Sequence, residues 1–81
     1  MQVAVRLSSE LARVAGIARL SVELDPGATV RDLRLAVEQR TPALGGALHA
    51  ALPLIRGAHV GPDHALTAGE EVSLLLPAAG G

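Results

Sequence analysis

The feature that most restricts the possible folds is one amphipathic helix in the middle of the chain. An apolar stripe at helical spacing runs along one face, formed by Val30, Leu33, Ala36 and Val37. Thr29 and Asp32 have the spacing of a capping box at its start. Pro42 stops it, because the residue before a proline avoids the helical region. A helix with one apolar stripe needs a sheet to lie on.

Segments of alternating polarity, before and after the helix in the sequence, supply the strands of that sheet. A short helical segment, starting at Ser8 or Ser9 and stopping at Gly16, separates the first two strands. This order predicts an α+β fold, in which a mixed sheet of four to five strands carries one main helix on one face. The first and last strands should be neighbours in the middle of that sheet. Period-2 alternation and turn residues predict the strands at 2–7, 19–24, 52–56, 58–61 and 72–76.

Length and composition exclude several classes of function. The 81 residues make one domain. Without cysteine the chain has no disulfide, thiolate metal site or cysteine nucleophile. A net charge of −1 and the absence of aromatic residues argue against nucleic-acid binding. The apolar run 42–55 is too short and too interrupted to span a bilayer. We therefore expect a soluble cytoplasmic protein with no nucleic-acid or membrane partner, and we leave 42–51 open between helix and coil.

The last strand is apolar on both sides. Leu74 and Leu76 should face the helix, so Leu75 should face away from it. An outward Leu75, joined by Leu7, would form an exposed apolar patch of the kind that marks interfaces. The alternative is that loops of this protein cover Leu75.

The sequence after this strand is unusually poor in side chains. Pro77 stiffens the exit from the sheet, and the residues beyond it carry at most one methyl group each. Fully extended, this segment reaches at most ~17 Å, enough to enter a narrow channel in another protein. We therefore divide the chain into a domain, 1–77, and a flexible tail, 78–81. The predicted contacts of the tail with a partner are made by Pro77, Ala78, Ala79, Gly80 and Gly81.

Residues 57–81 resemble the C-terminal third of the MoaD/ThiS sulfur-carrier family of ubiquitin-like proteins. The resemblance rests on the turn at Gly57, the segment Asp-His-Ala-Leu-Thr-Ala-Gly-Glu-Glu-Val at 63–72, and the terminal Pro77-x-x-Gly80-Gly81. Length and the helix after the first strand are closest to the small subunit of molybdopterin synthase. The sequence departs from the family pattern at several places where proline, Ser or Thr, Asn or an aromatic residue is usual: Leu76, Ala79, Arg56, Ser8, Leu74 and Leu75.

This resemblance implies a ubiquitin-like β-grasp fold and a role as sulfur carrier. The carboxylate of Gly81 would be adenylated by an ATP-dependent E1-like enzyme of the MoeB/ThiF type. A sulfurtransferase or cysteine desulfurase would then supply the sulfur of a thiocarboxylate. With the large subunit of molybdopterin synthase, of the MoaE type, the carrier would give this sulfur to the pterin precursor of the molybdenum cofactor. The chain itself would bind no cofactor and no metal, and would not be catalytic alone.

Other interpretations remain open at this stage. The same first step would serve a carrier for thiamine or tRNA thiolation, or a ubiquitin-like protein modifier. A non-covalent adaptor with an idle diglycine is the third possibility. His59, Asp63 and His64 are better explained as surface residues than as a metal site. We expect Arg34 and Glu38 to form an i,i+4 pair. The helix arginines, Arg31, Arg34 and Arg40, form either a solvated face or a surface for an acidic partner.

Overall fold

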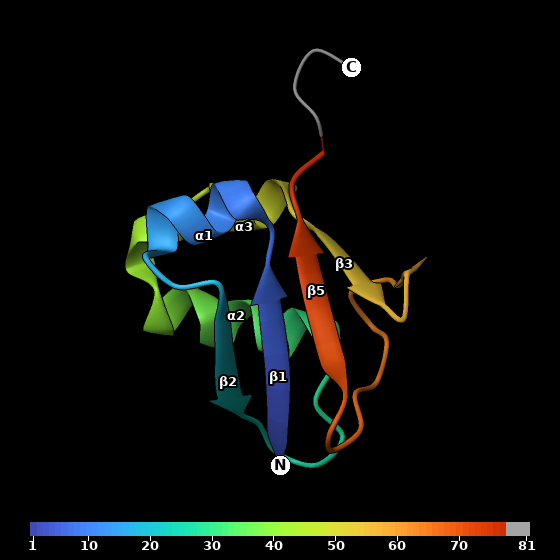
Figure 1. The fold of residues 1–81 in the computed structure, drawn as a ribbon. Coiled ribbons are helices and arrows are strands. Elements are labelled where there is room, and N and C mark those ends of the chain that lie inside the picture. Colours follow the sequence, from blue (N-terminus) through green and yellow to red (C-terminus); the bar gives the residue numbers. More distant parts are fainter. Residues whose placement is uncertain (78–81) are drawn as a thin grey trace.

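Five strands form one mixed sheet whose two central strands are the first and the last in the chain (Figure 1). The computed structural model describes residues 1–77. The strand order is β2-β1-β5-β3-β4, with β1 parallel to β5 and the other pairs antiparallel. The predicted neighbours are therefore confirmed. The strands are β1 (Gln2–Leu7), β2 (Arg19–Glu23), β3 (Leu52–Ile55), β4 (Ala58–His59) and β5 (Glu71–Leu75).

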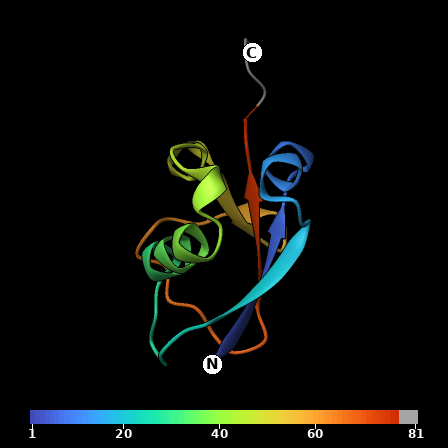
Figure 2. The same ribbon diagram turned by 90° about the vertical axis from the view of Figure 1, so that its left-hand side faces the viewer.

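The main helix, α2 (Val30–Arg40), lies on one side of this sheet (Figure 2). Its capping box forms as predicted. The backbone N–H of Thr29 donates to Asp32 Oδ2 at 2.8 Å, and the Asp32 N–H donates to Thr29 Oγ1 at 3.4 Å. The predicted apolar stripe is buried, with Val30, Leu33 and Val37 fully covered. The helix thus forms at the residues that its own sequence specifies.

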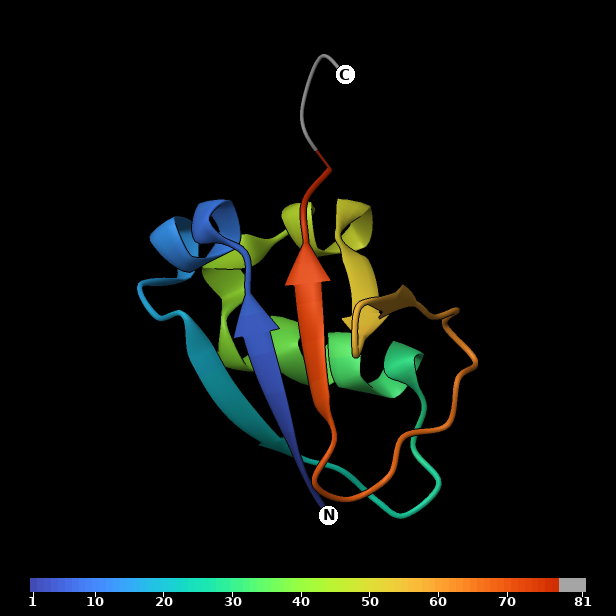
Figure 3. The ribbon, with the colours of Figure 1, turned by 45° about the vertical axis from the view of Figure 1, so that its right-hand side comes forward.

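Two further helices lie at the end of the sheet where β1 and β5 finish. In Figures 2 and 3, α1 (Ser9–Ala15) and α3 (Ala47–Ala50) stand on either side of the chain leaving β5. Gly16 ends α1 in the left-handed conformation, with φ +82°, as its glycine predicts. The undecided segment 42–51 forms a 3₁₀ turn, η1 (Pro42–Leu44), followed by the single turn of α3.

The core between sheet and helices is entirely aliphatic. Among the described residues no polar or charged residue is fully buried, although Ser8 Oγ and Arg34 Nε are enclosed without a hydrogen-bond partner. Leu66 is 3% exposed and fills the space under its loop, where its N–H donates to the Ala28 carbonyl at 2.9 Å. Alternating residues of β1, β2 and β5 supply the sheet side of the core: Val3, Val5, Leu7, Leu20, Val22, Val72 and Leu74.

One predicted surface contact is wrong. Arg34 and Glu38 do not form an ion pair: Arg34 Nη2 donates to the Ala51 carbonyl at 3.3 Å, and Glu38 lies 3.5 Å from His49 Nε2. The segment 42–51 brings these alternative partners to the helix. The spacing of residues within the helix alone cannot predict them.

A β1–β2 hairpin, a crossing helix and a return strand parallel to β1 constitute the ubiquitin-like β-grasp fold. The fold expected from the sequence is therefore confirmed. Within residues 1–77, no helix is long and apolar enough to cross a membrane.

Candidate functional site

The candidate site is the end of β5, from which the chain continues toward Gly81. β5 lies between β1 and β3, and its last pairs are Leu74 with Leu7 and Leu75 with Leu52. The Ser8 N–H donates to the Leu74 carbonyl at 2.9 Å. Strand pairing on both sides holds this end of β5 in place. Pro77 is exposed beyond it, and its contact with a partner stays a prediction. Ala78, Ala79, Gly80 and Gly81 lie outside the described residues, so their roles stay predictions.

Leucine side chains are exposed beside this strand end. Leu75 is 43% exposed and faces away from α2, so loops of this protein do not cover it. Leu52, its neighbour on β3, is 38% exposed, and Leu54 on the same face is half-buried. We call Leu52, Leu54 and Leu75 the leucine patch. A patch of this kind next to a strand end is suited to contact a partner protein.

Leu7 does not belong to the patch, and its predicted exposure beside Leu75 is wrong. Its side chain is 5% exposed and packs in the core opposite Leu74. The reason is parity: Leu7 follows Val3 and Val5 on the helix side, while Arg6 and Ser73 lie on the open side. The sequence prediction also missed Leu52 and Leu54. Their alternation with Pro53 and Ile55 places them on one face, but only the pairing with β5 brings them to Leu75.

The motif at 63–72 positions the start of β5. Glu70 Oε1 accepts a hydrogen bond from the Thr67 N–H at 2.8 Å, and Gly69 supplies a φ of +84° to the same turn. This backbone hydrogen bond lowers the pKa of the half-buried Glu70 carboxyl below its ordinary value. Asp63 lies 2.7 Å from Arg31 Nη1, which ties the loop to the first turn of α2. The motif is thus scaffold for the last strand.

The three residues considered as metal ligands do not form a metal site. No group of three metal-binding side chains comes together within the part of the chain that the structure describes. Asp63 is ion-paired with Arg31. His59 lies on the two-residue strand β4, paired with Leu54 in the register.

The family profile that matches this chain covers residues 5–81 and is described as the ThiS family. The match extends from β1 through the helix and the 63–72 motif to Gly80-Gly81. This chain belongs to the ThiS family. The resemblance found in the sequence is therefore confirmed. A search of curated proteins gave no match to this ThiS-family protein.

Solved structures resemble this ThiS-family protein over its whole length. SAMP1 from Haloferax volcanii, small archaeal modifier protein 1, is 29% identical, with 100% of both chains covered and a TM-score of 0.91. A putative molybdopterin converting factor subunit 1 from Pyrococcus furiosus is 23% identical, with 96% and 99% covered and a TM-score of 0.83. A Helicobacter pylori structure is 22% identical, with 100% of both chains covered and a TM-score of 0.72. It is a complex of subunits 1 and 2 of molybdopterin-converting factor. The last two show likeness of fold.

Proposed function

We propose that this protein is a sulfur carrier that works through the carboxylate of Gly81. The observation that carries the proposal is the junction at the end of β5 within a ThiS-family chain. A central strand, paired on both sides, ends beside the leucine patch and leads into residues with almost no side chain. A partner enzyme can bind the leucine patch, so that the Gly81 carboxylate reaches the active site of the enzyme. The chain supplies the substrate, and the partner supplies catalysis.

The proposed chemistry has three steps. A Gly81 carboxylate oxygen attacks the α-phosphorus of ATP in an E1-like enzyme, which forms an acyl adenylate and releases pyrophosphate. A persulfide sulfur on a sulfurtransferase or cysteine desulfurase then attacks the carbonyl carbon and displaces AMP. A thiol cleaves the resulting acyl disulfide, which leaves the thiocarboxylate on Gly81 and a disulfide on the other product. No step requires a catalytic side chain of this protein.

The acceptor that we favour is the pterin precursor of molybdopterin, reached with a large synthase subunit. The choice rests on the length of the chain and on the helix after the first strand, which are closest to the small subunit of molybdopterin synthase. In this role the protein is the small sulfur-donor subunit of the synthase.

A protein modifier of the SAMP type is the second candidate. It is favoured by the 29% identity to SAMP1, the similar structure at the higher identity. All seven basic residues of this chain are arginine, so copies of it could not be joined through lysine. Attachment to a target would therefore add a single copy at each site.

Intact mass spectrometry tests the carrier proposal. The protein is incubated with an activating enzyme, ATP and a sulfur source, and we expect a mass gain of one oxygen-to-sulfur exchange. Gly81→Val should abolish the gain, because a branched side chain obstructs a narrow channel. Gly61→Val is the matched control: a side chain at Gly61 meets no atom within 4 Å and its φ is not positive, so the mass gain should persist. An unchanged mass for the wild type, with an enzyme proven active on another carrier, would contradict the proposal.

The two acceptors can be separated with the thiocarboxylated or activated protein. A molybdopterin role predicts a stable complex with a large synthase subunit and conversion of the pterin precursor. A modifier role predicts isopeptide-linked adducts in which Gly81 is joined to lysine of another protein. Adducts without synthase binding would replace the first candidate by the second.

A further inference from the structure

The seven arginines of the chain fall into two groups. The three on α2 each have an acceptor within the protein: Arg31 pairs with Asp63 at 2.7 Å, Arg34 donates to the Ala51 carbonyl, and Arg40 donates to the Ser21 carbonyl at 3.1 Å. The other four form no ion pair or side-chain hydrogen bond within residues 1–77. These are Arg6, Arg13, Arg19 and Arg56.

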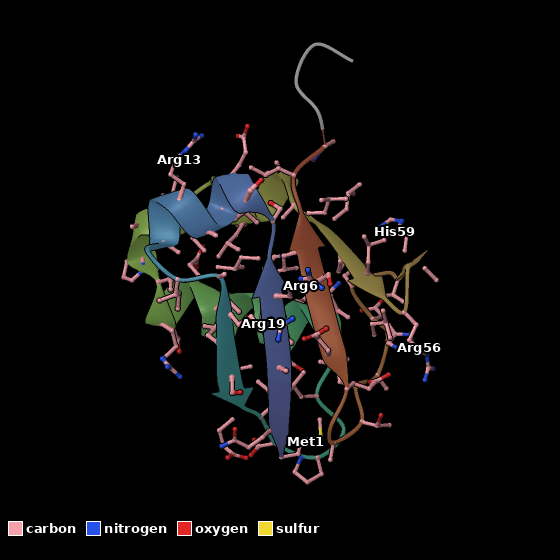
Figure 4. All side chains as sticks on the ribbon, in the orientation of Figure 1. Met1, Arg6, Arg13, Arg19, Arg56 and His59 are labelled. Carbon is pink, nitrogen blue, oxygen red and sulfur yellow. The ribbon has the colours of Figure 1, made fainter. Side chains whose placement is uncertain are left out.

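Two of these four lie side by side on adjacent strands, on the open face of the sheet. Arg6 on β1 and Arg19 on β2 are direct register partners, and both are exposed on the face opposite α2 (Figure 4). Like charges directly opposite on neighbouring strands destabilise the sheet. Of the acids on this face, Glu23 lies 2.6 Å from the Met1 ammonium group, and Glu71, the register partner of Ala4, forms no ion pair with either arginine within residues 1–77. Within residues 1–77, the arginine pair therefore has no acid at ion-pair distance.

The arginine pair borders a groove with an apolar floor. The groove runs between α1 and the β1–β2 strands. Ile17, which lines it, is 43% exposed although it is a large aliphatic residue. Arg13 forms the outer wall from α1, with its guanidinium directed away from the sheet (Figure 4). We call this feature the three-arginine groove; it is lined by Arg6, Ala12, Arg13, Ile17, Ala18 and Arg19, among others.

Charge and polarity together define the ligand that fits. Two arginines on adjacent strands match carboxylates, which guanidinium groups can bind through paired hydrogen bonds. The exposed aliphatic floor favours a ligand that also carries an apolar side chain. Nucleic acid fits less well, because the chain has no aromatic residue for base stacking and a net charge of −1.

We propose that the three-arginine groove binds an acidic segment of a partner protein. Carboxylates of that segment bridge Arg6 and Arg19, and a neighbouring apolar side chain covers Ile17. The proposal does not depend on the chemistry of Gly81. The groove is a second contact surface, on the β1–β2 side of the leucine patch, for whichever protein carries the segment.

Nuclear magnetic resonance with a defined probe tests this. The full chain, labelled with ¹⁵N, is titrated with a short capped peptide of glutamates interrupted by leucines. Its control has glutamine in place of every glutamate. We expect shifts confined to β1, α1 and the segment 16–19, loss of binding with the control peptide, and weakening by salt.

Charge-reversed variants make the test specific. Arg6→Glu with Arg19→Glu should weaken peptide binding at least roughly tenfold, because hydrogen bonds between charged groups are lost. Arg31→Glu with Arg40→Glu changes the net charge equally on the other side and should change binding by less than about twofold. Thermal melting of both variants establishes that they fold.

Equal weakening by the two double variants would overturn the proposal, since binding would then follow net charge alone. Shifts spread evenly over all seven arginines would do the same. An oligothymidylate that binds the groove more tightly than the acidic peptide, at equal charge, would replace the protein partner by nucleic acid.

Discussion

The two faces of the sheet differ in the type and the burial of their side chains. On the face toward α2, alternate residues of β1 and β5 are aliphatic and buried, and the helix arginines all find acceptors within the protein. The open face exposes Leu75 and Leu52 and holds Arg6 opposite Arg19. The same contrast occurs within β5, where Leu74 is 1% exposed and its neighbour Leu75 is 43% exposed.

This difference separates residues that make the fold from residues that the fold displays. On the covered face, the buried aliphatic side chains and the paired helix arginines favour the folded chain. The open face instead keeps two like charges on adjacent strands and leaves leucine side chains in water. Costs of this kind persist in proteins where they serve a contact. The functional residues are therefore expected on the open face.

The largest expected effect comes from shortening the two neighbouring leucines. Leu74→Ala leaves a cavity in the core and should lower the free energy of unfolding by about 2–5 kcal/mol. Leu75→Ala should change it by less than about 1 kcal/mol, because the side chain is already in water. Urea unfolding of both variants measures the difference. Equal losses would mean that Leu75 is a core residue and would remove the distinction between the faces.

A smaller effect should distinguish the caps of the two helices. Thr29→Ala removes the hydroxyl of the α2 capping box and should cost about 0.5–2 kcal/mol. Ser8 stands at the same position of α1, but its hydroxyl makes no cap hydrogen bond and its Oγ is buried without a partner among the described residues. Ser8→Ala should therefore be neutral or slightly stabilising. Thermal unfolding of the pair checks this, and a Ser8→Ala loss as large as that of Thr29→Ala would contradict it.

The smallest effect concerns the charge pair on the open face. Arg19→Glu converts a like-charge pair with Arg6 into an opposite-charge pair, which should stabilise the protein by about 0.2–1 kcal/mol. For a domain of this size the melting temperature should rise by about 1–8 °C. Arg19→Gln, which only removes the repulsion, should give a smaller rise. A fall in melting temperature for both variants would show that the pair costs nothing.

Most of the fold could be predicted from the sequence because its signals are local. The α2 stripe with its capping box, the Gly16 stop and the alternation in β1, β2 and β5 each specify their element without reference to the rest of the chain. Even the outward direction of Leu75 followed from alternation alone. The segment 42–51 was undecided because its glycines and alanines suit coil and short helix equally.

The candidate site was only half predictable, because it depends on contacts between distant segments. Leu52 reaches Leu75 through strand pairing over more than twenty residues of chain, and the Arg6–Arg19 pair requires the hairpin register. The prediction that Leu7 lies beside Leu75 on the open face is wrong. Its alternation with Val3 and Val5 places it on the helix side, where it is buried. The sequence leaves the helix arginines open between a solvated face and a docking surface, because their acceptors on distant segments become visible only in the fold.

The most direct test of this account is the rate of thiocarboxylate formation, followed by intact mass, in two matched sets of variants. Leu75→Glu with Leu52→Glu alters the leucine patch, whereas Leu35→Glu alters a leucine on α2 that is 52% exposed. Loss of an interface contact of this kind should slow the reaction at least roughly tenfold for the patch variant. The Leu35 variant should react within about twofold of the wild type. Equal rates for the patch variant and the wild type, both folded, would contradict the claim that the open face beside the end of β5 presents Gly81 to its partner.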